Sequence, residues 1–178
     1  MRFYLPCCFS SLLLLGIFIQ PAAAKADPPT YSEPDGMART CYAVHERTKE
    51  LVAVVGIKDD AYGFYGYSMY NDAGWPVIIL DAKRLAKQPQ IISRFTYYHE
   101  CAHLATPMSD EVMANCIALK KMRANGDLTP DEEQLVANFV ISFDKLKGEY
   151  LGSGKKFWDA TLKCADANVT EVGETKAE

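Results

Sequence analysis

Residues 90–115 read QIISRFTYYHECAHLATPMSDEVMAN, and this segment predicts two consecutive helices. Apolar side chains recur at helical spacing in its first half: Ile91, Ile92, Phe95 and Tyr98. Thr106-Pro107 ends this first helix, over residues 90–104, because proline cannot continue a helix. Ser109 is a suitable N-cap for a second helix over residues 110–124, which Asn125-Gly126 closes. The two helices are therefore predicted to be neighbours joined by a short turn.

The first helix carries His99-Glu100-Cys101-Ala102-His103, an H-E-x-x-H pattern. Residues four apart lie on one face of a helix, so both imidazoles can reach one metal ion. Neutral imidazole is a good zinc ligand, and Glu100 is placed to take a proton from a metal-bound water. The chain has three histidines, and two of them make this motif. Their spacing inside a predicted helix indicates a metal site rather than an accidental pattern on a surface helix.

A third protein ligand is expected, because catalytic zinc sites usually hold three side chains and a water. Glu111 begins the next helix, and two helices joined by a tight turn bring that first turn near the end of the motif helix. Asp110 is the second choice, whereas His45 is far away in the sequence. Asn115 shares the face of Glu111 one turn later, where its side-chain oxygen can orient a ligating histidine. The alternative for Glu111 is a purely electrostatic role at the helix N-terminus.

The combination of HECAH with Glu111-Val-Met-Ala-Asn115 resembles the gluzincin group of zinc metallopeptidases. The short separation of the two parts is similar to that of compact, exported bacterial members. The resemblance covers roughly Trp75 to Cys164 and is specific from Tyr97 to Leu119. It implies that the two motif histidines and Glu111 bind zinc, and that Glu100 is the catalytic base.

Two features differ from the gluzincin pattern. Asn115 stands where the family usually has an aspartate. Residues 150–156 contain neither the His-Pro pair nor the arginine that relatives often carry after the third core helix. A transition-state stabiliser is therefore not assigned. The alternative function is a non-catalytic exported zinc-binding domain with a structural or partner-binding role, and a third is an exported interaction module without metal.

Periodicity and turn residues predict the remaining elements. Helices are expected at residues 39–51, 82–87 with Asp81 as cap, 130–147 after the Thr129 start signal, and 155–165; strands are expected at residues 52–57, 62–70 and 75–80. The last two strands form a hairpin whose edge could pair with an extended peptide. Its aromatic residues are interpreted as packing rather than as a substrate surface: Tyr62, Phe64, Tyr65, Tyr67 and Tyr70. The fold class is α+β, a mainly helical zincin-like core with a small antiparallel sheet or hairpin.

Residues 1–26 are interpreted as a secretory signal peptide. Arg2 supplies the positive start, the apolar run Phe9 to Ile19 is too short to span a membrane, and Pro21 and a run of alanines follow. The alternative is a short uncleaved anchor. Cleavage after Ala26, with Ala24 as the second choice, predicts an exported protein, periplasmic or secreted, with no stable membrane anchor.

Four cysteines remain after such cleavage, and an even number in an exported chain favours two disulfides. Cys101 and Cys116 lie off the ligand faces of the two adjoining helices, which predicts a bond between them. Cys41 and Cys164 would then join the two ends of the domain. The alternative is that Cys101 is a buried free thiol.

The composition fits one globular domain: 178 residues, of which 49% are hydrophobic and 24% charged. A formal charge of −4 disfavours a nucleic-acid partner. We divide the chain into the signal peptide, an extended leader at residues 27–38, a zincin-like metallopeptidase domain at residues 39–166 and a flexible tail at residues 167–178. The predicted function is zinc-dependent hydrolysis of a peptide or protein substrate.

Overall fold

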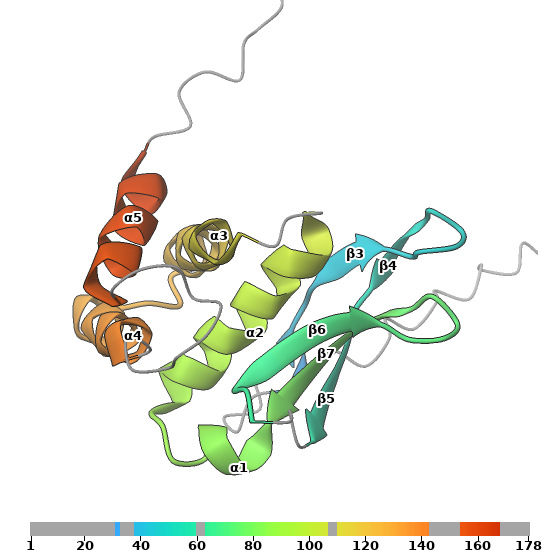
Figure 1. The fold of residues 1–178 in the computed structure, drawn as a ribbon, viewed down its shortest axis with the longest axis horizontal. Helices are drawn as coiled ribbons and strands as arrows, with labels where there is room; N and C mark the ends of the chain where they lie inside the picture. Colours follow the sequence, from blue (N-terminus) through green and yellow to red (C-terminus); the bar gives the residue numbers. More distant parts are fainter. Residues whose placement is uncertain (1–30, 33–37, 60–62, 107–109, 143–153, 168–178) are drawn as a thin grey trace, which may run out of the picture.

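The computed structural model of this protein describes residues 31–32, 38–59, 63–106, 110–142 and 154–167. Its long helix α2 (Gln90–Ala105) lies between a sheet and further helices (Figure 1). The strands of this sheet are β5 (Val55–Asp59), β6 (Gly66–Tyr70) and β7 (Pro76–Asp81). The helices on the other side of α2 are α3 (Glu111–Ala124), α4 (Pro130–Ser142) and α5 (Gly154–Asp166). The α+β fold class is therefore confirmed.

The three-stranded sheet has the order β5-β7-β6, so β6 is an edge strand. β6 and β7 form the predicted antiparallel hairpin, in which Ser68 pairs with Ile78, while β5 runs parallel to β7. The Asn71 side chain closes the hairpin turn by accepting hydrogen bonds from two backbone N–H groups. Gly74 completes the turn with a φ of 88°, a backbone conformation that glycine adopts without strain.

The helix predicted at residues 39–51 is wrong. This segment contains β2 (Ala38–Arg39), which pairs with β1 (Tyr31–Ser32), and then β3 (Tyr42–Val44), which pairs with β4 (Leu51–Ala53). Burial alternates along β3: Ala43 is buried, whereas Tyr42 and Val44 are exposed. An alternation with a period of two is typical of a strand that has one face packed against the rest of the protein and the other in solvent. The strand predicted at residues 52–57 is interrupted at Val54, where the chain passes from β4 to β5.

The other helices follow their local signals. Asp81 caps α1 (Ala82–Leu85), as predicted. Asp110 rather than Ser109 caps α3, because its carboxylate accepts a hydrogen bond from Met113 N; Ser109 itself lies outside the described residues. Thr129 and Glu132 bond reciprocally before α4 in a capping box. The predicted end of α4 near residue 147 and the tail at residues 168–178 also lie outside the described residues.

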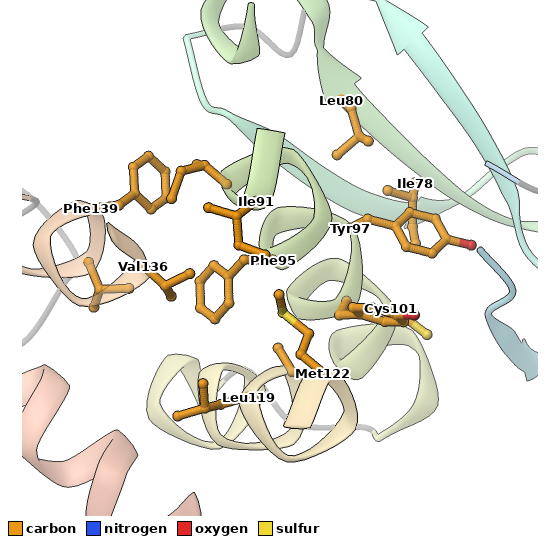
Figure 2. Close-up of a cluster of buried hydrophobic side chains, with 14 of the residues drawn as sticks. Ile78, Leu80, Ile91, Phe95, Tyr97, Cys101, Leu119, Met122, Val136 and Phe139 are labelled. Atoms are coloured by element: carbon orange, nitrogen blue, oxygen red, sulfur yellow. The ribbon is translucent and has the colours of Figure 1, made fainter. Parts of the chain in front are cut away.

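Helix α2 is buried on opposite faces, which fixes the position of the motif it carries. Figure 2 shows Tyr97 on the side of the sheet residue Ile78, while Ile91 and Phe95 face Val136 of α4. The Tyr97 ring is fully buried, and its hydroxyl donates a hydrogen bond to the Arg39 carbonyl oxygen. Apolar contacts on both sides hold α2 against rotation or sliding.

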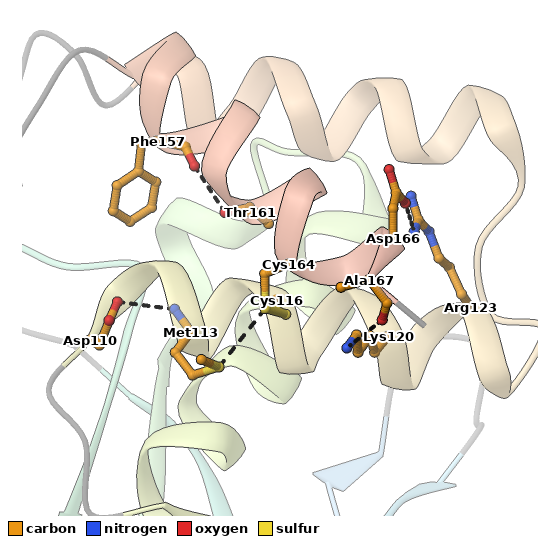
Figure 3. Close-up of a disulfide and its surroundings, with 10 residues drawn as sticks. All are labelled: Asp110, Met113, Cys116, Lys120, Arg123, Phe157, Thr161, Cys164, Asp166 and Ala167. Carbon is orange, nitrogen blue, oxygen red and sulfur yellow. Dashed lines mark hydrogen bonds and ion pairs between the residues drawn. A yellow bond between two sulfur atoms is a disulfide. The ribbon is translucent and has the colours of Figure 1, made fainter. Parts of the chain in front are cut away.

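The four cysteines form two disulfides, as predicted, but the predicted pairing is wrong. Cys101 is bonded to Cys41, just before β3, with 5.8 Å between the Cα atoms. Cys116 of α3 is bonded to Cys164 of α5, with 5.7 Å between the Cα atoms (Figure 3). The free-thiol alternative for Cys101 is therefore wrong as well. The reason is that α2 packs against both β3 and α3, and its cysteine lies on the β3 side.

Candidate metal centre

The predicted ligands come from the end of α2 and the start of α3, which pack against each other. His99 and His103 lie one turn apart on α2, with 4.7 Å between ring centroids and an interplanar angle of 81°. Glu111 is the first residue of α3. The side chain of its neighbour, Asp110, is engaged as the N-cap, so Glu111 is the carboxylate that joins the histidines.

Three potential ligand atoms converge. Glu111 Oε2 lies 3.0 Å from His99 Nε2 and 3.5 Å from His103 Nε2. The two Nε2 atoms are 3.1 Å apart. Ligands about 2.0–2.1 Å from a tetrahedral zinc ion are separated by roughly 3.3 Å, and the observed separations lie around that value. The cluster could therefore hold one metal ion, as the sequence predicts.

Asn115 contacts His99 as predicted, because its Oδ1 lies 2.8 Å from His99 Nδ1. An amide oxygen only accepts hydrogen bonds, so Nδ1 carries the proton. In neutral His99 the lone pair is then on Nε2, which faces the Glu111 carboxylate. Two acceptor atoms at 3.0 Å repel each other unless a proton or a cation lies between them. The donor set is thus suited to a cation.

Glu111 is ionised in this environment. Burial would raise its pKa, but the electrostatic attraction of the His103 and His99 imidazoles beside it outweighs that effect and lowers the pKa to about 2. The side chain remains 33% exposed, so the cluster is accessible from solvent. A carboxylate that is already deprotonated can bind a metal without first losing a proton.

Glu100 is adjacent to the cluster but does not belong to it. It is 7% exposed, and Ser68 Oγ of β6 donates a hydrogen bond of 3.0 Å to its Oε2. Burial raises the pKa of Glu100, while the charges of His99 and His103 lower it in part. The site therefore combines three potential ligands with a separate buried carboxylate.

His45 is a structural residue rather than a ligand. It is buried, and its Nδ1 accepts hydrogen bonds from Arg47 N and Thr48 N. Its ring packs edge-on against Trp75, with 4.8 Å between centroids. These contacts explain why only the other two histidines take part in the cluster found among the described residues.

The aromatic residues of the hairpin divide between packing and exposure. Tyr65 packs edge-on against Phe139, and Tyr70 packs against the core, in line with the predicted packing role. Phe64 is exposed, and Tyr62 lies outside the described residues. Ser68 was not identified from the sequence; its only signal there is its place in the predicted edge strand.

Comparison of the chain with protein-family models, with curated proteins and with solved structures found no match. The functional conclusion therefore depends on the residues of the site.

Proposed function

We propose that this protein is an exported, zinc-dependent peptidase of the gluzincin type. One observation supports this most strongly: two imidazoles and a carboxylate converge within 3.0–3.5 Å, with a buried, non-ligating carboxylate on the same helix. A purely structural metal site has no need for that second carboxylate, which is not a ligand.

Zinc is the metal that this donor set favours. His99, His103 and Glu111 provide two nitrogens and one oxygen, the ligand set of several catalytic zinc sites. Three protein side chains would hold the ion, one fewer than the four that close a structural zinc site. When bound, zinc supplies Lewis-acid chemistry, which polarises a carbonyl group and acidifies a coordinated water.

Glu100 is the proposed general base. Its carboxylate is fixed between α2 and β6 by burial and by the Ser68 hydroxyl. From there it would accept the proton of the attacking water and transfer it to the departing amine. A carboxylate that was bound to the metal would be less able to accept and pass on this proton.

Strand β6 is the proposed binding edge for the peptide. Asp81 N donates to Tyr65 O and Asn71 N donates to Trp75 O, so every second residue of β6, beginning at Tyr67, is bonded to β7. The backbone groups of the alternate residues, Gly66, Ser68 and Tyr70, point away from β7. An extended peptide could pair with those groups.

The two disulfides are consistent with an oxidising, exported environment. Among the described residues, no helix combines the length and apolar character needed to cross a membrane. The proposed signal peptide at residues 1–26 lies outside the described residues. A periplasmic or extracellular destination completes the proposal.

Metal analysis and a substitution of the base test this proposal together. The purified protein should hold one zinc per chain, and His99→Ala should lose it. Glu100→Gln should retain zinc and lose hydrolysis of a mixed peptide library, because an amide cannot accept the proton. Glu46→Gln is the matched control, since this exposed side chain lies between β3 and β4, where its backbone N–H bonds Gly74 of the hairpin turn.

Each failure has its own meaning. Stoichiometric zinc without turnover by the unmodified protein would support a non-catalytic zinc-binding domain. A protein without metal would support an interaction module. Full turnover by Glu100→Gln would remove Glu100 from the mechanism.

A further inference from the structure

We propose that Ser68 is a positioning residue for Glu100, and that β6 thereby orients the base as well as the peptide. This inference rests on the proposed peptidase function. The Ser68 hydroxyl lies 3.0 Å from Glu100 Oε2 and is the hydrogen-bond donor that the described structure provides for this carboxylate. Because Oε2 is engaged by Ser68, the other oxygen, Oε1, is the one left for proton transfer.

The position of Ser68 relative to Glu100 is set by close packing. A Cβ added at Gly66 would lie 2.8 Å from Thr96 Cγ2 and 3.3 Å from Glu100 Cγ. The absence of a side chain at Gly66 therefore allows β6 to approach α2 closely. The pairing of Ser68 with Ile78 in the sheet then fixes its register.

A nearby hydroxyl does not take over this role. Thr96 Oγ1 donates a hydrogen bond of 2.8 Å to the Ile92 carbonyl oxygen of its own helix. Removal of the Ser68 hydroxyl would therefore leave Glu100 Oε2 without its donor while the carboxylate stays buried. Such a carboxylate is expected to rotate or to occupy several orientations.

Ser68 also connects the base to the substrate. Its backbone N–H and C=O are among the groups that point away from β7, where a peptide could pair, while its side chain contacts Glu100. One residue would thus define both the position of the peptide backbone and the orientation of the base. Loss of the hydroxyl should affect the chemical step and leave backbone pairing intact.

The kinetic test compares Ser68→Ala with Ser68→Thr, which keeps a hydroxyl. Ser68→Ala should lower kcat about 10- to 100-fold, the scale expected when a catalytic group is misplaced. KM should stay within about twofold, because the backbone groups remain. Zinc content should be unchanged, and Ser68→Thr should recover most of kcat. Ser93→Ala, which changes a buried serine of α2, is the matched control and should give the kcat and KM of the unmodified protein.

A structural readout tests the proposal independently of turnover. Crystal structures of the metal-free protein should show one orientation of the Glu100 carboxylate with Ser68 present, and a rotated or divided one in Ser68→Ala. An unchanged single orientation, or an unchanged kcat, would overturn the positioning role. Failure of the peptidase proposal is distinguishable, since it would appear as turnover by Glu100→Gln or as no turnover at all, whatever the orientation observed.

Discussion

Asn115→Ala should weaken metal binding without removing any ligand. Asn115 is 3% exposed, and its Oδ1 accepts the hydrogen bond that directs His99 Nε2 toward the cluster. Loss of a buried hydrogen-bond partner costs about 1–3 kcal/mol. Substitution of groups that orient metal ligands typically lowers metal affinity by about 10- to 100-fold, or roughly 1.4–2.8 kcal/mol. The two scales agree, so we expect zinc affinity to fall by one to two orders of magnitude.

Competition with a chromophoric chelator measures this change directly. Asn115→Asp should bind zinc at least as tightly as the unmodified protein, because a carboxylate holds the same imidazole N–H more strongly. Asn138→Ala is the control, since that side chain is exposed on α4 and its Oδ1 accepts a hydrogen bond from Gln134 Nε2. If Asn115→Ala bound zinc within twofold of the unmodified protein, the orienting role of this contact would be refuted.

Three further predictions concern the framework. Gly66→Ala should lower the free energy of unfolding by about 1–3 kcal/mol, because its Cβ would lie 2.8 Å from an α2 methyl group; an unchanged urea midpoint would contradict the close packing. Replacing both Cys41 and Cys101 by alanine opens a loop of 60 residues and should lower the free energy of unfolding by about 4 kcal/mol, because the disulfide no longer restricts the unfolded chain. Guanidinium unfolding measures this change, and a decrease near zero would contradict that explanation. Thr129→Ala should cost about 1 kcal/mol at neutral pH. Hydrogen bonds from Thr129 lower the pKa of Glu132, so this stabilisation is present above the ordinary carboxyl pKa of 4.5 and is lost as the pH falls through the lowered value. The stability difference between Thr129→Ala and the unmodified protein should therefore shrink in acid, as measured by unfolding at several pH values.

Local sequence was sufficient where a few neighbouring residues determine the structure. The spacing of His99 and His103 places them on one face of any helix, and the few residues between Ala105 and Glu111 leave little room for α3 to begin elsewhere. The contact between Asn115 and His99 follows from the same two helices. The hairpin of β6 and β7 was likewise predictable, because its turn residues and apolar strands are adjacent in the chain.

Sequence patterns were misleading where a segment depends on distant partners. Residues 39–51 contain enough helix-forming residues to suggest a helix, but β2 and β3 gain their hydrogen bonds from β1 and β4 and are tied to α2 through Cys41. The error in the predicted cysteine pairing had the same origin. Adjacency of α2 and α3 suggested a bond between them, whereas the direction of each sulfur is set by which neighbour packs on that side of its helix.

The sequence alone therefore determined which side chains could form a metal cluster, because helical periodicity and a short turn are local properties. Only the tertiary structure decided that β6 approaches α2 closely enough for Ser68 to bond Glu100, and that Cys41, just before β3, and Cys164 of α5 are the partner cysteines. Those contacts join residues 32 to 60 positions apart, and their geometry arises from the packing of whole elements rather than from any local pattern.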